Sequence, residues 1–185
     1  MTEPSFQSWR KPSAVMIILA AGSDPRILLI ARPRTLTYHA GQIAYPGGSF
    51  DARHDRTLWD TARRETLEEV GIAIPAESLA GFLDPVHIAV SGFTLCPIVA
   101  VVAEAPAVTP NPSEVSGYEW VSLRDLRAVR RMAHFSTPES AYWLPEFGLT
   151  MGRLWGATAR VTDQLLGVLD GGGRCTFDRC TKLTK

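Results

Sequence analysis

The sequence of 185 residues has no long apolar run and no excess of either charge. No stretch reaches the ~20 consecutive apolar residues that span a bilayer, so we expect no membrane association. Lys plus Arg and Asp plus Glu are equal, at 19 each, which argues against a protein that covers nucleic acid with positive charge. The balance leaves room for one local site that binds a small charged molecule.

Cysteine is also scarce. Cys96, Cys175 and Cys180 are odd in number and far apart, so they form no disulfide framework, and no matching His or Cys pair completes a zinc site. A reducing, cytoplasmic location is expected. The apolar run 14–21 faintly resembles a signal peptide, but turn residues 22–25 end it and a second apolar run follows. Two strands joined by a turn are the better interpretation.

The order of elements predicts a single domain over residues 13–170, with a lead-in at 1–12 and a flexible tail at 171–185. The expected elements are strands at 14–20 and 27–32, a long loop at 33–56, a helix at 57–70, strands at 85–90, 94–103 and 117–121, a short helix at 122–130, and a helix at 154–169. Residues 132–150 are predicted to be irregular, with a possible strand at 142–144. Strands with helices interspersed indicate an α+β fold with a mixed sheet.

The helix at 57–70 carries its own start and stop signals. Thr57 and Asp60 have the spacing of a capping box, with Asp in the place of the more usual Glu or Gln. Gly71 suits the left-handed position that follows a helix. The boundaries of this helix are therefore expected to be sharp.

Three glutamates of this helix share one face. Glu65, Glu68 and Glu69 stand at i, i+3 and i+4, where like charges destabilise a helix by ~0.2–0.5 kcal/mol per pair. The plain interpretation is a solvated acidic face. The alternative is a site for a hard divalent cation such as Mg²⁺ or Mn²⁺, which prefers carboxylate oxygens.

The residues before the helix favour the cation site. Gly47 and Gly48 form a loop that lets backbone approach a phosphate closely. Arg64 stands beside Glu65 and could orient that carboxylate. A metal cluster, a possible base and a close-approach loop together suit phosphoryl chemistry.

The run from Arg64 to Ile72, Arg-Glu-Thr-Leu-Glu-Glu-Val-Gly-Ile, resembles the second half of the Nudix hydrolase signature. The first half departs, because position 56 is Arg where the signature has Glu and the stretch between Gly48 and Arg64 is longer. Either Asp51 or Asp55 is a candidate to replace that glutamate.

A narrower resemblance joins residues 28–48 to the motif of coenzyme A diphosphatases. The matching positions are Leu28, Leu29, Arg32, Gly41, Pro46, Gly47 and Gly48. The departures are Ile30, Pro33, Thr37 and Tyr45. Thr37 matters most, because it replaces an arginine that could bind substrate phosphate.

The resemblance implies a Nudix-type α/β/α sandwich around a mixed sheet, and attack by water on phosphorus in a nucleoside diphosphate derivative, with coenzyme A or an acyl-CoA first in order. The expected catalytic residues are Glu65, Arg64 and Glu68. The expected metal ligands, for Mg²⁺ or Mn²⁺, are Glu65, Glu68 and Glu69. The expected substrate-binding residues are Arg32, Arg34, Gly47 and Gly48.

Two alternatives stay open. One is a Nudix hydrolase of ADP-ribose, dinucleotides or nucleoside triphosphates. The other is a non-catalytic Nudix-fold nucleotide sensor, which the retention of all three glutamates disfavours. The role of Glu114 as an extra carboxylate and the formation of a homodimer are left undecided by the sequence.

Overall fold

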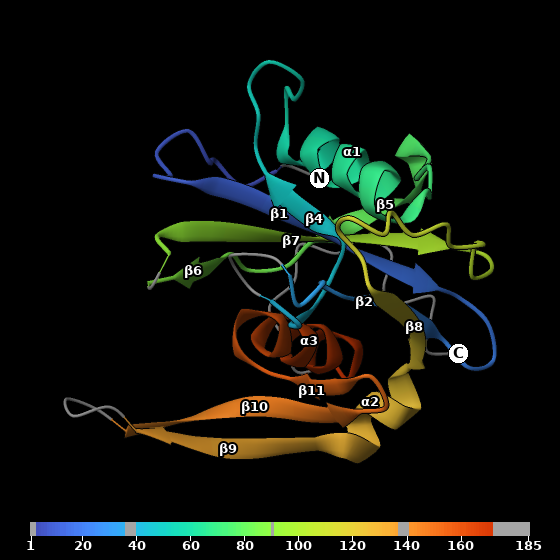
Figure 1. Ribbon diagram of the computed structural model, residues 1–185, viewed down its shortest axis with the longest axis vertical. Helices are drawn as coiled ribbons and strands as arrows, with labels where there is room; N and C mark the ends of the chain where they lie inside the picture. Colours follow the sequence, from blue (N-terminus) through green and yellow to red (C-terminus); the bar gives the residue numbers. More distant parts are fainter. Residues whose placement is uncertain (1–2, 36–39, 90, 137–140, 172–185) are drawn as a thin grey trace.

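The computed structural model describes residues 3–35, 40–89, 91–136 and 141–171 (Figure 1). An eight-stranded mixed sheet lies at the centre, with helix α1 on one face and helix α3 on the other. This arrangement confirms the predicted α+β class and the α/β/α sandwich. Within the described residues, no helix is long and apolar enough to cross a membrane.

The helices and strands follow one another in a mixed order. They are β1 (Pro12–Ala20), β2 (Arg26–Ala31), β3 (Ile43–Ala44), β4 (Gly47–Ser49), α1 (Leu58–Val70), the 3-10 helix η1 (Ala76–Ser78), β5 (Leu79–Phe82), β6 (Val86–Ile88), β7 (Phe93–Val102), β8 (Gly117–Ser122), α2 (Leu123–Val129), β9 (Arg130–Ser136), β10 (Ala141–Leu149), β11 (Gly152–Leu154) and α3 (Gly156–Leu169).

Strand β1 is the centre of the main sheet, whose path runs β3-β2-β1-β7-β5. It pairs in parallel with β7 along its whole length, from Pro12 opposite Thr94 to Ala20 opposite Val102. It pairs antiparallel with β2 and with β4. Because β4 is the strand of the two glycines, this pairing brings the glycine loop to the middle of the sheet.

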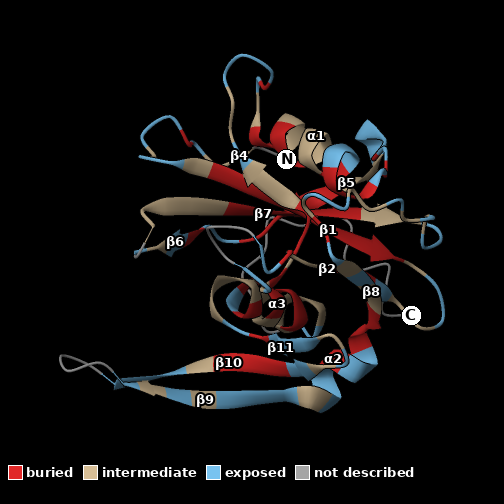
Figure 2. Cartoon of the chain, in the orientation of Figure 1, coloured by how far each residue is buried: buried red, intermediate tan, exposed pale blue. Residues whose placement is uncertain are grey.

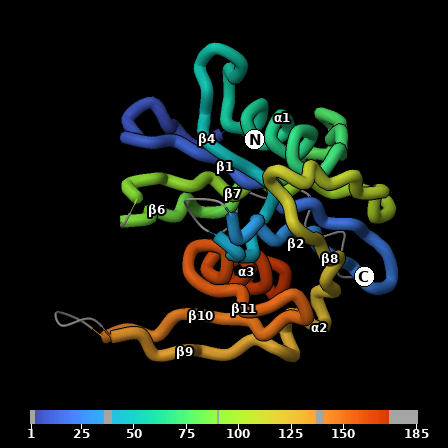
Figure 3. Tube along the Cα trace, viewed as in Figure 1, coloured from blue at the N-terminus to red at the C-terminus, as the bar shows by residue number. Residues whose placement is uncertain are grey.

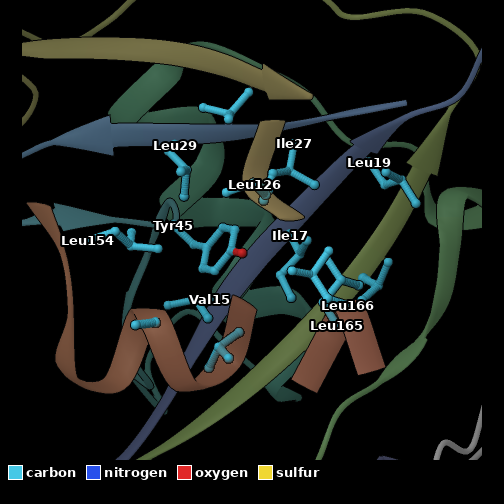
Figure 4. Close-up of a cluster of buried hydrophobic side chains, with 14 of the residues drawn as sticks. Val15, Ile17, Leu19, Ile27, Leu29, Tyr45, Leu126, Leu154, Leu165 and Leu166 are labelled. Carbon is cyan, nitrogen blue, oxygen red and sulfur yellow. The ribbon is translucent and has the colours of Figure 1, made fainter. Parts of the chain in front are cut away.

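The sheet separates two apolar cores, and the residues of β1 alternate between them. Val15, Ile17 and Leu19 face α3, whereas Ala14, Met16 and Ile18 face α1. Figure 4 shows the first set packed with Tyr45, Leu165 and Leu166, and Figure 2 shows that β1 is buried along most of its length. Burial on both faces explains why this strand is a continuous apolar run.

Helix α1 has the boundaries that its sequence predicts. Thr57 accepts from the backbone of Asp60, and the Asp60 side chain accepts in return from the backbone of Thr57. Gly71 ends the helix with φ of 68°. Leu58, Ala62 and Val70 are buried in the core on the α1 side of the sheet, so the opposite stripe of the helix is left for the glutamates.

The prediction of an irregular segment at 132–150 was wrong. Strands β9 and β10 form an antiparallel pair, and β11 adds to the other edge of β10 to give a second sheet of three strands. In the tube view this sheet lies beyond α3, away from α1 (Figure 3). Only the possible strand at 142–144 anticipated it.

Candidate active site

Glu69 is the most buried carboxylate of the glutamate helix, with 2% of its side chain exposed. Its Oε2 accepts from the backbone N–H of Gly47 at 2.9 Å, and its Oε1 lies 3.3 Å from Nη1 of Arg32. Burial raises the pKa of Glu69 to about 8, although these two donors oppose the shift. Glu69 is therefore fixed between the glycine loop and the end of β2, where burial disfavours its charged form.

Glu65, one turn before Glu69, and Glu68, directly before it, share Arg64. Nη1 of Arg64 donates to Oε1 of Glu65 at 2.7 Å and to Oε2 of Glu68 at 3.1 Å. Glu65 is largely buried, and burial raises its pKa in spite of the arginine. Glu68 is half-exposed. The three glutamates thus run from solvent at Glu68 to the interior at Glu69.

Arg64 is itself fixed by Asp55. Its Nε and Nη2 donate to the two oxygens of Asp55, each at 2.9 Å. Thr61 Oγ1 and the backbone N–H of Asp51 also donate to Asp55, at 2.9 and 3.0 Å. Burial opposes ionisation of Asp55, yet the hydrogen bond from Arg64 helps to hold its pKa below the usual range.

The two aspartates left open by the sequence therefore differ. Asp55 contacts the arginine of the helix, whereas the side chain of Asp51 is paired with Arg53 at 2.6 Å. Asp55 is the one that takes part in the carboxylate–arginine network. Its place could not be read from spacing, because the loop before the helix is longer than the usual signature.

The two glycines of β4 lie so close to neighbouring atoms that a larger residue would not fit at either position. A Cβ atom on Gly48 would collide with the carboxyl of Glu65. A Cβ atom on Gly47 would collide with the backbone of β1, and its φ of 153° also disfavours other residues. The glycines thus let the helix carboxylates touch the loop backbone, as the sequence led us to expect.

Glu114 joins the same region from a distant part of the chain. The loop that carries it covers the end of α1, where the backbone N–H of Asn111 donates to the carbonyl of Glu69 at 2.8 Å. After burial and the nearer groups, the charge of Glu114 further raises the pKa of Glu65 and of Glu69. Glu114 is therefore near enough for its charge to act on both glutamates. Sequence reasoning left this residue undecided because only the fold of the loop brings it there.

The predicted substrate cations are only partly described. Arg32 reaches the cluster, and its Nε is buried with no hydrogen-bond partner within the described residues. Arg34 lies exposed at the outer end of the same segment, beside Gly41. Thr37 and His39 lie outside the described residues.

The donor chemistry of the cluster fits a hard divalent cation. Several carboxylates meet in one region, where burial, and to a smaller extent the neighbouring carboxylates, raise the pKa of Glu65 and of Glu69. In the described part of the chain, no three side chains already converge at metal-ligand distance. Glu65 and Glu68 turn an oxygen to Arg64 instead, so both would have to turn to share an ion.

Comparison with known proteins agrees with this geometry. The model of the NUDIX domain matches residues 10–147. The Nudix hydrolase NudL of Pectobacterium atrosepticum is 30% identical over 164 residues, which cover 84% of this chain and 81% of that protein.

Two solved structures share the fold. A Nudix hydrolase from M. smegmatis, RenU, gives a TM-score of 0.59 at 22% identity and covers 88% of this chain and 87% of its own. The NUDIX domain of Shewanella oneidensis NrtR, in complex with ADP ribose, gives a TM-score of 0.54 at 19% identity. It covers 69% of this chain and 82% of its own. These two likenesses show the shared fold, and the family match over most of the sequence, with the identity to NudL, shows that the chain belongs to the Nudix family and is a hydrolase of phosphorus-containing anhydrides.

Proposed function

We propose that this Nudix hydrolase cleaves the diphosphate of coenzyme A or an acyl-CoA, with Mg²⁺ or Mn²⁺ held by Glu65, Glu68 and Glu69. The observation that carries the reaction type is the fixing of Glu69 against the backbone of Gly47. This contact puts a buried carboxylate beside a loop that a phosphate can approach closely. The preference for coenzyme A rests on the motif at residues 28–48.

In this mechanism water attacks one phosphorus of the diphosphate and the P–O bond to the bridging oxygen breaks. A bound divalent ion would neutralise charge on the phosphate oxygens and lower the pKa of the attacking water. Glu65 or Glu68 accepts the proton that the water loses. Arg64 keeps Glu65 in place through their 2.7 Å hydrogen bond, and Asp55 keeps Arg64 in place. Arg64 is then a positioning residue, the role that its place beside Glu65 in the sequence already suggested.

The substrate would lie over Gly47 and Gly48, with Arg32 beside it. The Nε of Arg32 is a buried donor without a partner in the described chain, so a substrate oxygen would satisfy it. Arg34 stands two residues further out, where it would meet a second phosphate. Coenzyme A carries a 3′-phosphate that suits such a second cation.

A second candidate substrate is ADP-ribose. The NrtR domain that shares this fold is bound to ADP ribose, and Thr37 removes one cation that the coenzyme A motif supplies. ADP-ribose has no 3′-phosphate, so it needs no additional cation. The metal site and the reaction type are the same for both candidates.

The deciding experiment compares kcat/KM for coenzyme A, its 3′-dephospho form and ADP-ribose with Mg²⁺ or Mn²⁺ present. If a cation binds the 3′-phosphate, coenzyme A should exceed the dephospho form by about 10- to 150-fold, which corresponds to one charge-assisted hydrogen bond of ~1.5–3 kcal/mol. Equal values would show that no group binds the 3′-phosphate. A higher value for ADP-ribose than for both would assign the enzyme to the alternative.

A further inference from the structure

Strand β9 is an edge strand that the rest of the described chain leaves uncovered. The second sheet has the order β11-β10-β9, so one side of β9 pairs with β10 and the other side pairs with no described strand. Figure 2 shows β9 exposed along most of its length. An exposed edge of seven residues offers unpaired backbone donors and acceptors to another strand.

The same hairpin carries an unusual share of exposed apolar surface. Of the six large apolar side chains that are exposed in the described residues, Met132, Tyr142 and Trp143 lie on β9 and β10, and Trp143 is 63% exposed. Contacts between the strands already order them. His134 packs edge-on against Trp143 at 5.2 Å, and Phe135 stacks with Tyr142 at 6.5 Å. A partner would therefore meet a preformed surface and lose little entropy on binding.

Charge on an edge strand usually prevents pairing, but both cations of β9 have an acidic partner within the chain. Arg130 bonds Asp163 of α3 at 2.5 Å, and Arg131 bonds Glu146 of β10. Glu146 is buried and also accepts from Arg153 at 2.6 Å. Because Arg131 and Arg153 share the one carboxylate of Glu146, this group keeps a positive charge at the hairpin, and β9 itself contains no acidic residue.

We propose that β9 pairs antiparallel with β9 of a second copy of this chain, which joins two three-stranded sheets into one of six strands. Full overlap of the strand puts Ala133 on the two-fold axis, with Met132 opposite His134 and Arg131 opposite Phe135. Residue i then meets residue j and j meets i, as a two-fold interface requires.

The antiparallel direction follows from charge. It separates Arg131 from its copy by four residues, ~14 Å along the strand, which exceeds the screening length of ~8 Å at physiological salt. A parallel pair would put the two copies of Arg131 side by side. The antiparallel pair also places Arg131 opposite Phe135 of the second copy. Within one chain the Phe135 ring already contacts a guanidinium, that of Arg153, at 5.6 Å from the ring centroid.

The first test measures association by analytical ultracentrifugation of the whole chain. We expect a concentration-dependent dimer. The double substitution Met132→Lys with His134→Lys sets like charges opposite each other across the pair and should weaken the dimer by at least about 100-fold. Met132→Glu with His134→Lys sets opposite charges there and should restore the dimer, which also shows that changes at both positions are compatible with folding.

A matched control places the same charge elsewhere. Leu67→Lys changes a side chain of α1 that is 53% exposed, far from β9 in Figure 1, and should leave association unchanged. A monomer at every accessible concentration would overturn the proposal. So would a dimer that survives the two lysines, because it would form through another surface.

The second test fixes the register. Ala133→Cys on the two-fold axis would place two cysteines with Cα atoms ~4.5–5.5 Å apart, within the range that a disulfide spans. The background carries Cys175→Ser and Cys180→Ser, and the remaining Cys96 is buried. We expect a covalent dimer on mild oxidation and none with Ser136→Cys, whose copies would lie at opposite ends of the pair. Equal crosslinking at both positions would contradict this register.

Discussion

At the scale of single residues, the site depends on how each carboxylate is compensated. Glu69 is compensated by a backbone N–H and by a long contact to Arg32, whereas Asp55 has four donors. Burial therefore raises the pKa of Glu69 but does not prevent the pKa of Asp55 from falling. The four donors suit Asp55 to a structural role. Glu69 has fewer donors, which suits the proposed role of metal ligand.

Glu69→Gln tests this distinction. Glutamine keeps an oxygen to accept from Gly47 and removes the negative charge, so turnover should fall by at least about 100-fold, beyond the 10–100-fold of residues that only orient a ligand. The folded state should be no less stable, because an undercompensated buried charge is costly. Steady-state kinetics at saturating metal and thermal unfolding measure the two effects. An unchanged rate would show that Glu69 is not a ligand.

Arg64→Ala tests the positioning role. Without Arg64, Glu65 and Glu68 lose their shared donor, so kcat should fall by about 10–100-fold while KM changes little, since the orientation of Glu65 matters most in the transition state. Asp55→Asn should give a smaller change of the same kind, because Asn still offers one acceptor to Arg64. A change in KM alone would contradict this role.

The sequence could point only to those parts of the candidate site whose signals are local. The three glutamates, the two glycines and Arg64 lie within 23 residues and follow from spacing. The anchoring by Asp55 and the approach of Glu114 depend on how loops fold, so the sequence could only offer them as candidates. Placement of the metal and of the substrate stays a prediction.

At the scale of elements, helix α1 and the second sheet show the same contrast. The helix was predicted because Thr57, Asp60 and Gly71 carry its boundaries in the sequence. The pair β9–β10 was missed because β9 is mostly exposed and so lacks a clear apolar alternation, and β10 contains Pro145, a residue that is rare inside strands. The pair owes its stability to contacts across strands, including Arg131 with Glu146, which no local pattern reveals.

The cap of α1 gives a prediction at this scale. Thr57→Ala removes the acceptor for the backbone of Asp60 and should destabilise the protein by about 1 kcal/mol, a fall in Tm of roughly 2–4 °C for a chain of this size. Thr57→Ser keeps the hydroxyl and should retain most of the Tm. Thermal unfolding by circular dichroism measures both. Equal losses for Ala and Ser would mean that the methyl group matters and the cap does not.

At the scale of the whole molecule, the sandwich holds the site by bringing three distant segments to one end of α1. The end of β2 supplies Arg32, the glycine strand lies antiparallel to β1, and the loop before β8 supplies Glu114. The assignment of residues 1–12 and 171–185 as lead-in and tail stays a prediction, since the family match begins at residue 10 and ends at residue 147.

Because the three glutamates share one face only in the folded helix, and Glu69 is fixed against Gly47 only in the folded chain, a divalent ion should bind the folded chain and not the unfolded one. Metal at 100 times its Kd would then stabilise the fold by ~2.7 kcal/mol, a rise in Tm of roughly 5–11 °C at about 2–4 °C per kcal/mol. Thermal unfolding with Mg²⁺ or Mn²⁺ and with excess chelator measures the difference, and turnover should vanish with the chelator. Glu69→Gln serves as the control, because it leaves the fold intact and should lose most of the rise. Full turnover in chelator would remove the metal from the mechanism, and an equal rise in the Gln variant would place the ion elsewhere.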